Sequence, residues 1–279
     1  MIIDVHTHLS TREQWGPVFC AASDSANAQL RVDLQVTPER HAAALQGVDR
    51  AIVFGINSLA FGLNTPNEAI AEYVGKYPDK FIGFMSVDPH QENALEEVDR
   101  SAKELGLRGI KMSPVYQNYH PHSEIARKVH RRAEELGLPI LTHAAFHSIA
   151  DTNMDWADPI LYDEVAREFP DLKIILAHMG LPWHDAAMVV VRKHPNVFAD
   201  ISPAFHRHWL YRAMLTFQEF DVMDKLLFAS DFPFSTPEKV IDVLRHINDP
   251  LEGTNLPRIE EEAIEALIQR DALALLGLE

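Results

Sequence analysis

Leu136-Gly137-Leu138-Pro139-Ile140-Leu141-Thr142-His143 holds in one stretch the pattern that decides the fold. Gly137 follows an apolar residue and marks the end of a helical segment, because glycine adopts the left-handed conformation of a helix C-terminus with little strain. The apolar run Ile140–Thr142 then predicts a buried strand. His143 follows this strand directly, so a polar side chain stands where the apolar run ends.

The same unit recurs along the chain, with apolar runs alternating with segments of helical spacing. Strict alternation indicates parallel strands joined by right-handed crossovers. Eight units favour a closed (β/α)8 TIM barrel over an open doubly wound sheet, and no glycine-rich phosphate motif follows the first strand. The predicted strands are Ile2–Val5, Ala51–Gly55, Phe81–Val87, Gly109–Met112, Ile140–Thr142, Lys173–Ala177, Val197–Ile201 and Leu226–Ala229. The predicted helices are Pro38–Gly47, Pro66–Tyr77, Glu92–Leu105, Ser123–Leu136, Pro159–Phe169, His184–His194, Phe205–Met223 and Pro237–Ile247.

Local signals refine this pattern at helix ends and in long connections. Thr37 is expected to cap the helix that follows it, and Thr65 with Glu68 forms a capping-box pattern. Two long connections, 10–36 and 202–211, are expected to overhang the carboxyl-terminal mouth of the barrel, where such folds build substrate pockets. The tail, 258–278, is expected to form a final helix on the outside.

Composition restricts the classes of partner. The 279 residues are 47% hydrophobic, which suits one packed domain over 1–279. Lys and Arg number 25 against 41 Asp and Glu, a net charge of −16 that argues against binding nucleic acid or anionic membranes. A single cysteine, Cys20, and polar residues where a signal peptide would be apolar favour a cytoplasmic protein. The expected partner is a small-molecule substrate, and a homodimer stays open.

Three His-x-His pairs occur in the chain, and their context separates them. His6 and His8 lie at the end of the first strand, where the two-residue period sends both imidazoles to one face. This pair is predicted to chelate a metal ion. The pairs at 120/122 and 206/208 lie in polar loops, where solvated or substrate-contacting roles are more natural.

Other strands also end in groups that bind metals or act on substrates. His143, His178 and Asp231 end the fifth, sixth and eighth strands, and Lys111 ends the fourth. In a barrel these ends converge on one mouth. A single histidine there is ordinarily a hydrogen-bonded rim residue, but the joint pattern favours a metal site. Nitrogen and carboxylate ligands suit Zn²⁺, with Mn²⁺, Fe²⁺ and Ni²⁺ as alternatives, better than Ca²⁺.

These motifs resemble the amidohydrolase superfamily, in particular its amidohydrolase-2 branch, which includes aminocarboxymuconate semialdehyde decarboxylase-like enzymes and lactone hydrolases. The resemblance spans nearly the whole chain. Its motifs are Asp4-Val5-His6-Thr7-His8, Gly109-Ile110-Lys111, Thr142-His143, Ala177-His178-Met179-Gly180, Ser230-Asp231-Phe232-Pro233 and the closing Asp271-Ala272-Leu273-Ala274-Leu275-Leu276-Gly277-Leu278.

The resemblance implies a mononuclear site. It implies that His6, His8, His143 and Asp231 bind the metal, and that His178 orients the metal-bound water or a substrate oxygen. A carboxylate such as Asp231 can also take a proton from that water.

Residues for substrate binding are less sharply defined by the sequence. Lys111 is expected to hold a substrate carboxylate; the alternatives are a salt bridge to a neighbouring acid and the carbamylated lysine of binuclear members of the superfamily. Trp183 and Arg207 are candidate substrate contacts, with outer packing and a solvated surface as their alternatives. Trp15 and Phe19, in the first long connection, are candidates for an apolar pocket wall.

Three functions remain open at this level. Hydrolysis of a lactone, amide or ester in a small carboxylated substrate is the first reading, because metal-activated water does this chemistry directly. Non-oxidative decarboxylation of a small unsaturated or aromatic acid is the alternative; His6 removes only those decarboxylases of the branch that begin with Glu at this position. A barrel that binds without catalysis would be expected to have lost a ligand, and none is missing.

Overall fold

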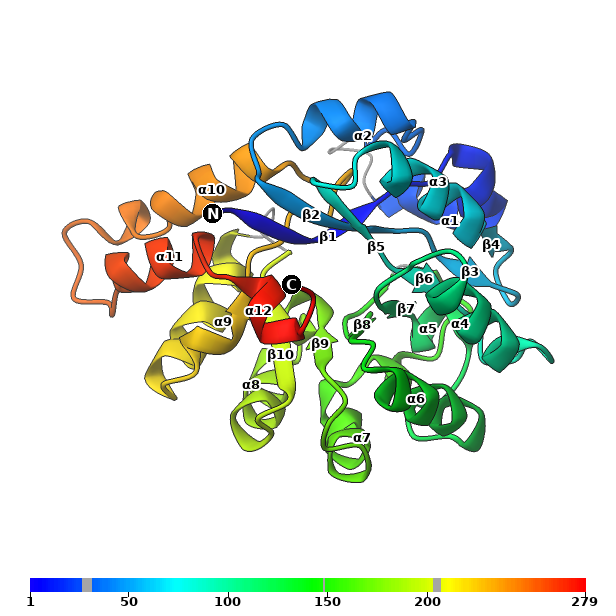
Figure 1. Ribbon diagram of the computed structural model, residues 1–279. Coiled ribbons are helices and arrows are strands. Elements are labelled where there is room, and N and C mark those ends of the chain that lie inside the picture. The colour runs from blue at the N-terminus through cyan, green and yellow to red at the C-terminus, as the bar shows by residue number, and fades with distance from the viewer. Residues whose placement is uncertain (27–31, 148, 203–206) are drawn as a thin grey trace.

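Parallel strands form the centre of the computed structural model, which describes residues 1–26, 32–147, 149–202 and 207–279 (Figure 1). All eight predicted strands are confirmed, and the third is divided into two short strands at Phe84. The barrel strands are β1 (Ile3–His8), β2 (Arg50–Phe54), β5 (Phe81–Gly83) continued by β6 (Met85–Ser86), β7 (Ile110–Met112), β8 (Ile140–Thr142), β9 (Ile174–Leu176), β10 (Val197–Asp200) and β11 (Leu226–Leu227).

Strand pairing follows the order of the chain. β1 pairs with β2 and β2 with β5, while β6 to β11 pair in sequence, all in parallel. Backbone hydrogen bonds also join β1 to the segment after β11: Val5 N donates to Phe228 O at 3.0 Å and Asp231 N to His6 O at 2.9 Å. The first and eighth strands are therefore neighbours, and the fold is a (β/α)8 barrel.

Helices surround these strands, as Figure 1 shows. The predicted helices are confirmed, although Phe205, where one was expected to begin, lies outside the described residues. The helices are α2 (Pro38–Ala44), α3 (Asn67–Lys76), α4 (Ala94–Lys103), α5 (Pro114–Gln117), α6 (Glu124–Leu136), α7 (Tyr162–Glu168), α8 (His184–Lys193), α9 (Arg207–Glu219) and α10 (Pro237–Arg245). Short 3-10 helices are η1 (Met154–Ala157), η2 (Pro159–Leu161), η3 (Ala177–Gly180), η4 (Met223–Lys225) and η5 (Asp249–Leu251). A hairpin of β3 (Asn57–Ser58) and β4 (Leu63–Asn64) follows β2.

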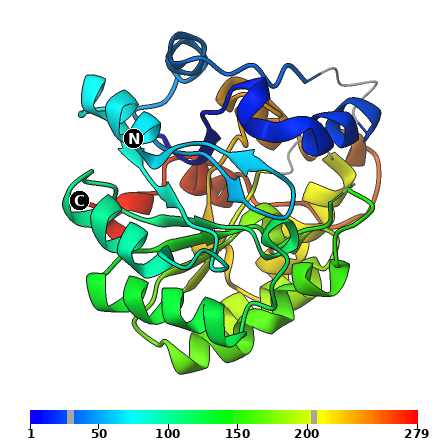
Figure 2. The ribbon, with the colours of Figure 1, turned by 90° about the vertical axis from the view of Figure 1, so that its right-hand side faces the viewer.

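The first long connection contains a helix that the sequence did not predict, α1 (Arg12–Ala26). Gly16 and Pro17 interrupt the helical pattern of this segment, and Gly16 has a φ of 73°. A Cβ at Gly16 would lie 2.7 Å from the carbonyl oxygen of Gly62, so the helix packs closely on the β3–β4 hairpin. Figure 2 shows α1 on one side of the molecule and both termini on the other.

The tail corrects a second prediction. It forms two helices, α11 (Glu261–Ile268) and α12 (Ala272–Leu276), rather than one outer helix. Leu273 and Leu276 of α12 belong to the buried cluster formed inside the barrel by residues such as Val5 and Ile52. α12 therefore covers the amino-terminal end of the barrel, and Figure 1 shows it over the middle of the ring of strands.

Two helix caps were predicted, and one is wrong. Thr37 caps α2 by accepting a hydrogen bond from Arg40 N. Thr65 does not cap α3, which begins after Pro66 without a side-chain cap. The Thr65 hydroxyl instead bonds to that of Ser10 at 2.7 Å, because a partner from the neighbouring loop competes with the local backbone. No helix formed by the described residues is long and apolar enough to cross a membrane.

Candidate metal centre

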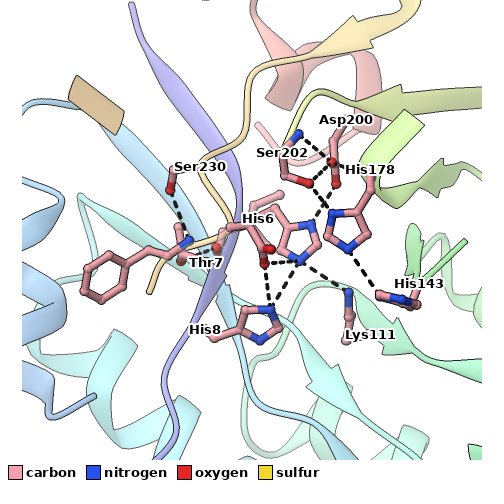
Figure 3. A network of polar contacts seen from close by, with 12 residues as sticks. His6, Thr7, His8, Lys111, His143, His178, Asp200, Ser202 and Ser230 are labelled. Atoms are coloured by element: carbon pink, nitrogen blue, oxygen red, sulfur yellow. Dashed lines mark hydrogen bonds and ion pairs between the residues drawn. The ribbon is translucent and has the colours of Figure 1, made fainter. Parts of the chain in front are cut away.

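The polar side chains that end the strands gather at the carboxyl-terminal mouth of the barrel, as predicted (Figure 3). Their placement depends on an irregularity in β1: between Asp4 and Thr7, this strand has one residue more than β2. Such a bulge re-aims the side chains that follow it. Ile3 and Val5 thus join the apolar interior, while His6 and His8 point into the mouth.

Three ligand-type atoms form a nearly equilateral triangle. His6 Nε2 lies 3.3 Å from His8 Nε2 and 3.2 Å from Asp231 Oδ1, and His8 Nε2 lies 3.1 Å from the same oxygen. Ligand atoms bonded at ~2.0–2.1 Å to a tetrahedral ion lie ~3.3 Å apart. All three residues are buried. The triangle therefore has the spacing of one face of a metal coordination shell.

Asp200, at the end of β10, holds His6 from behind. His6 Nδ1 lies 2.8 Å from Asp200 Oδ2, and a carboxylate accepts hydrogen bonds, so the proton of this neutral imidazole is on Nδ1. His6 Nε2 then carries a lone pair toward the triangle. Burial, and after it the charge of Lys111, hold the pKa of His6 well below its usual value, which keeps the ring neutral.

His143 lies beside the triangle but does not complete it. Its Nδ1 lies 3.2 Å from His178 Nε2. Among the described residues, two groups have potential ligand atoms that all lie within 4.8 Å of one another, and neither contains His143: His6, His8 and Asp231, and His6, His178 and Asp200. His143 Nε2 is buried and has no hydrogen-bond partner within the described ranges. The assignment of His143 as a ligand stays a prediction, and the unpartnered nitrogen is compatible with it.

His178 is held by a second polar network. Its Nδ1 lies 2.7 Å from the hydroxyl of Ser202, and its backbone N–H donates to Asp200 Oδ1 at 2.9 Å. His178 and Asp231 both have positive φ angles, 61° and 56°. Such conformations are uncommon outside glycine and occur often at functional sites.

Asp4 joins the strand that carries His6 to the segment that carries Asp231. Its Oδ1 accepts the backbone N–H of His6 at 3.1 Å and that of Ser230 at 3.0 Å. These bonds fix the strand carrying His6 against the segment carrying Asp231. Burial raises the pKa of Asp4 to about 7, and burial likewise raises that of Asp231 well above its usual value.

Lys111 is a buried ammonium group without an acidic partner among the described residues. Its Nζ lies 3.5 Å from His6 Nε2 and 4.8 Å above the ring of Phe54, and the side chain is 1% exposed. The salt bridge weighed from the sequence is not found in the described structure. Burial lowers the pKa of Lys111 to about 8, a shift opposed by Asp200 and Asp231.

Aromatic rings surround His8 at the mouth. Trp15 packs at 5.2 Å between ring centroids, and Phe54 at 4.8 Å. Trp15 stacks on Phe19, which also contacts Tyr116. The indole N–H of Trp15 is buried without a hydrogen-bond partner in the part of the chain that is described. This wall brings the rings of the first long connection close to the metal triangle.

Among the described residues, no hydrogen bond or ring contact joins the other predicted substrate contacts to this network. Trp183 is half-buried just before α8, and no ring contact joins it to the site histidines among the described residues. Arg207 begins α9, and its Nε and Nη2 have no hydrogen-bond partner within the described ranges. His122 is bound by Glu164 and Glu168 on the outer surface, while His206 lies outside the described residues.

A family model for amidohydrolases matches residues 3–278. The chain belongs to the amidohydrolase family. This amidohydrolase also resembles solved structures along its whole length. A probable 2-pyrone-4,6-dicarboxylic acid hydrolase from Acinetobacter baumannii is 16% identical, with a TM-score of 0.70 and 99% of both chains covered.

Two decarboxylase structures are similar to the same degree. The 5-carboxyvanillate decarboxylase from Sphingomonas paucimobilis is 15% identical, with a TM-score of 0.69, over 100% of this chain and 99% of the other. A dihydroxybenzoic acid decarboxylase from Polaromonas sp. JS666, with bound manganese, is 21% identical, with a TM-score of 0.68, over 99% and 97%. At these identities the similarity shows the shared barrel fold.

Two residues of the amidohydrolase site were missed from the sequence. Asp200 lies one residue before the end of the seventh predicted strand, Val197–Ile201, and is the last residue of β10, while Ser202 directly follows the predicted strand. Applying the strand-end rule to all eight strands would have found Asp200. Ser202 has no such signal, because a serine two residues beyond a strand is common in loops.

Proposed function

We propose that this amidohydrolase is a metal-dependent hydrolase that opens a lactone, amide or ester bond in a small carboxylated substrate. The observation that carries the proposal is the position of the Lys111 ammonium, 3.5 Å from a nitrogen of the metal triangle and without an acidic partner in the described structure. A substrate carboxylate bound there would hold the rest of the molecule at the triangle.

The proposed cofactor is one divalent ion, most simply Zn²⁺, with Mn²⁺, Fe²⁺ or Ni²⁺ as alternatives. His6 Nε2, His8 Nε2 and Asp231 Oδ1 would hold it, and the unpartnered His143 Nε2 suits a fourth ligand. The bound ion would polarise the scissile carbonyl and make water more acidic. Manganese in the Polaromonas structure is consistent with a divalent ion at such a site.

The proposed roles of the protein groups follow from their positions. Asp231 accepts the proton of the attacking water, because its carboxylate lies at the triangle, whereas Asp200 is fully buried and occupied by hydrogen bonds to His6 and Ser202. We assign to His178 the orientation of the reacting oxygen, and this role passes through His143, because His178 Nε2 contacts His143 Nδ1 at 3.2 Å. Lys111 holds the substrate carboxylate by a charge-assisted hydrogen bond.

Decarboxylation of a small aromatic acid is the second candidate, and the aromatic wall favours it. Trp15 and Phe54 flank His8 with rings that suit a planar substrate. The similarity to two aromatic-acid decarboxylases supports it at the level of the fold. The two reactions share the metal and Lys111 but differ in what water contributes.

Isotopic labelling separates the two candidates. Purified protein loaded with Zn²⁺ or Mn²⁺ is incubated in H₂¹⁸O with carboxylated lactones and, separately, with hydroxylated benzoic acids. Hydrolysis places one ¹⁸O atom in the new carboxylate and releases no CO₂. Stoichiometric CO₂ release without addition of water to the product would overturn the hydrolase proposal in favour of the decarboxylase.

A further inference from the structure

Two chains of hydrogen bonds, called arms below, start at Asp200: the first reaches His6, and the second runs through Ser202 to His178. Asp200 Oδ2 lies 2.8 Å from His6 Nδ1, and Asp200 Oδ1 accepts the hydroxyl of Ser202 at 2.5 Å. Both Asp200 and Ser202 are fully buried. We propose that Asp200 fixes the tautomers of His6, His178 and His143, so that His6 and His143 each present Nε2 to the metal ion. This assigns positioning roles to Asp200 and Ser202, and it holds for either candidate reaction.

The first arm needs a single hydrogen bond. A carboxylate oxygen only accepts, so His6 Nδ1 donates to Asp200. In a neutral imidazole the other nitrogen is then unprotonated. The Lys111 ammonium, 3.5 Å from His6 Nε2, agrees with this direction, because an ammonium group only donates.

The second arm passes through Ser202. The hydroxyl has one proton, which must lie toward Asp200, because two oxygens 2.5 Å apart without a proton between them would repel. Ser202 Oγ can then only accept from its other neighbour, His178 Nδ1, at 2.7 Å. His178 is therefore protonated on Nδ1, and its Nε2 carries a lone pair.

His143 is the end of this arm. Its Nδ1 faces His178 Nε2 at 3.2 Å, so a proton on His143 Nδ1 makes this contact a hydrogen bond instead of a repulsion between lone pairs. His143 Nε2 is then the unprotonated atom. It is also the nitrogen left buried and unpartnered among the described residues. One carboxylate thus leaves Nε2 unprotonated on two histidines, His6 and His143, which come from different strands.

Such an arrangement lowers the cost of binding a cation. A histidine whose proton is on the wrong nitrogen must change tautomer before it can ligate, and outer hydrogen-bond partners typically contribute 10–100-fold to metal affinity. His8 shows the contrast: its Nδ1 has no hydrogen-bond partner in the described part of the chain. No hydrogen bond at Nδ1 therefore fixes the proton of His8 within the described ranges.

Nitrogen NMR of the full chain tests the proton positions directly. In zinc-loaded protein labelled with ¹⁵N-histidine, protonated and metal-bound ring nitrogens have distinct chemical shifts. We expect protons on Nδ1 of His6, His143 and His178, and metal-bound shifts for Nε2 of His6 and His143. An unprotonated Nδ1 on His143 or His178 would overturn the proposal. This includes the outcome in which His143 Nδ1 and His178 Nε2 both bind the ion.

Variants of Ser202 test the second arm through zinc affinity, measured by competition with a chelator. Ser202→Ala removes the acceptor of His178 Nδ1 and should weaken zinc binding by about tenfold or more, and Ser202→Thr should restore affinity to within about threefold. Ser101→Ala is the matched control, because Ser101 on α4 also has a buried hydroxyl, which is hydrogen-bonded to Glu97 at 2.9 Å. The zinc affinity of this variant should equal that of the unchanged protein.

The outcomes are distinct even if a variant folds poorly. Unchanged zinc affinity in a folded Ser202→Ala protein would overturn the role of Ser202. If Ser202→Thr does not fold, Asp200→Asn, which keeps the volume of the side chain, replaces it. His6 and Ser202 donate to different oxygens of Asp200, and in asparagine one of the two becomes an NH₂ group, which only donates. One of the two donors then loses its acceptor, so the ¹⁵N shifts of His6 or of His178 must change in this variant. Unchanged shifts of both would contradict the proposal.

Discussion

At the scale of single residues, Asp231 has two proposed roles. Its Oδ1 is one corner of the triangle of ligand-type atoms, and its carboxylate is the proposed proton acceptor. Asp231→Asn keeps the shape and removes the charge. We expect kcat to fall by about 10²–10⁴-fold, with little change in thermal stability. Steady-state kinetics and thermal unfolding measure both quantities.

A matched control for this change exists at the other end of the barrel. Asp271 caps α12 through a hydrogen bond from Ala274 N at 3.1 Å, and asparagine caps helices as well as aspartate does. Asp271→Asn should leave kcat unchanged. Retention of most activity by Asp231→Asn would show that the proton acceptor is another group.

Lys111 is predicted to act on binding more than on turnover. Lys111→Met keeps a long side chain and removes a buried charge that has no acidic partner among the described residues. KM for a carboxylated substrate should rise by about 10–100-fold, because a hydrogen bond to a charged group contributes about 1.5–3 kcal/mol. KM for an uncharged analogue serves as the control. Equal effects on both substrates would contradict the assigned role.

The sequence predicted this site through strand ends, and its success differs between residues. His6, His8 and Asp231 meet because a strand end determines the place of a side chain to within a few ångströms. His143 also lies at the mouth, but its partner depends on ring rotation, which no sequence pattern specifies. The role of Asp200 was missed because this residue contacts His6 of the first strand and Ser202 two residues further along the chain, and no sequence pattern shows that Asp200 and His6 meet.

At the scale of elements, α1 forms part of the mouth, and Gly16 fixes its approach to the β3–β4 hairpin. Gly16→Ala would place a methyl group 2.7 Å from a backbone oxygen at a φ of 73°. We expect a loss of about 1–3 kcal/mol in the free energy of unfolding and a higher KM, because Trp15 lies on the same helix.

Gly75 provides the matched control within another helix. A Cβ there would meet nothing within 4 Å, and Gly75 lies in α3. Gly75→Ala should stabilise the protein by about 0.5–1 kcal/mol without changing KM. Denaturant unfolding distinguishes the two variants. Equal stability of both would mean that α1 does not pack as described.

The elements also show where prediction from sequence reached its limit. Apolar runs fixed all eight strands, because a strand buried on both faces must be apolar throughout. α1 was missed since Gly16 and Pro17 resemble a helix break, and the amphipathic tail did not reveal which surface it covers. The Thr65 cap was wrong because a tertiary contact with Ser10 replaced it.

At the scale of the whole molecule, the candidate site and the packing of the C-terminal helix lie at opposite ends of the barrel. The site lies at the carboxyl-terminal mouth, and α12 seals the opposite end with Leu273 in the interior cluster. Leu273→Ala should therefore cost about 2–5 kcal/mol of unfolding free energy while kcat of the folded protein is unchanged. The organisation of residues 1–279 as one domain stays a prediction.

Leu275 on the same helix is the control for this prediction. It is 37% exposed, whereas Leu273 is 4% exposed. Leu275→Ala should change stability by less than about 0.5 kcal/mol, as surface substitutions usually do. A comparable loss in both variants would indicate that α12 does not close the barrel through the face described.

The central claim is that His6, His8 and Asp231 hold one metal ion at the mouth of the barrel. Anomalous diffraction from crystals grown with Zn²⁺ measures the position of the ion directly. We predict one strong peak about 2.0–2.2 Å from His6 Nε2, His8 Nε2 and an Asp231 oxygen, with His143 Nε2 as the fourth protein ligand. A strong peak elsewhere, with none at this triangle, would contradict the claim.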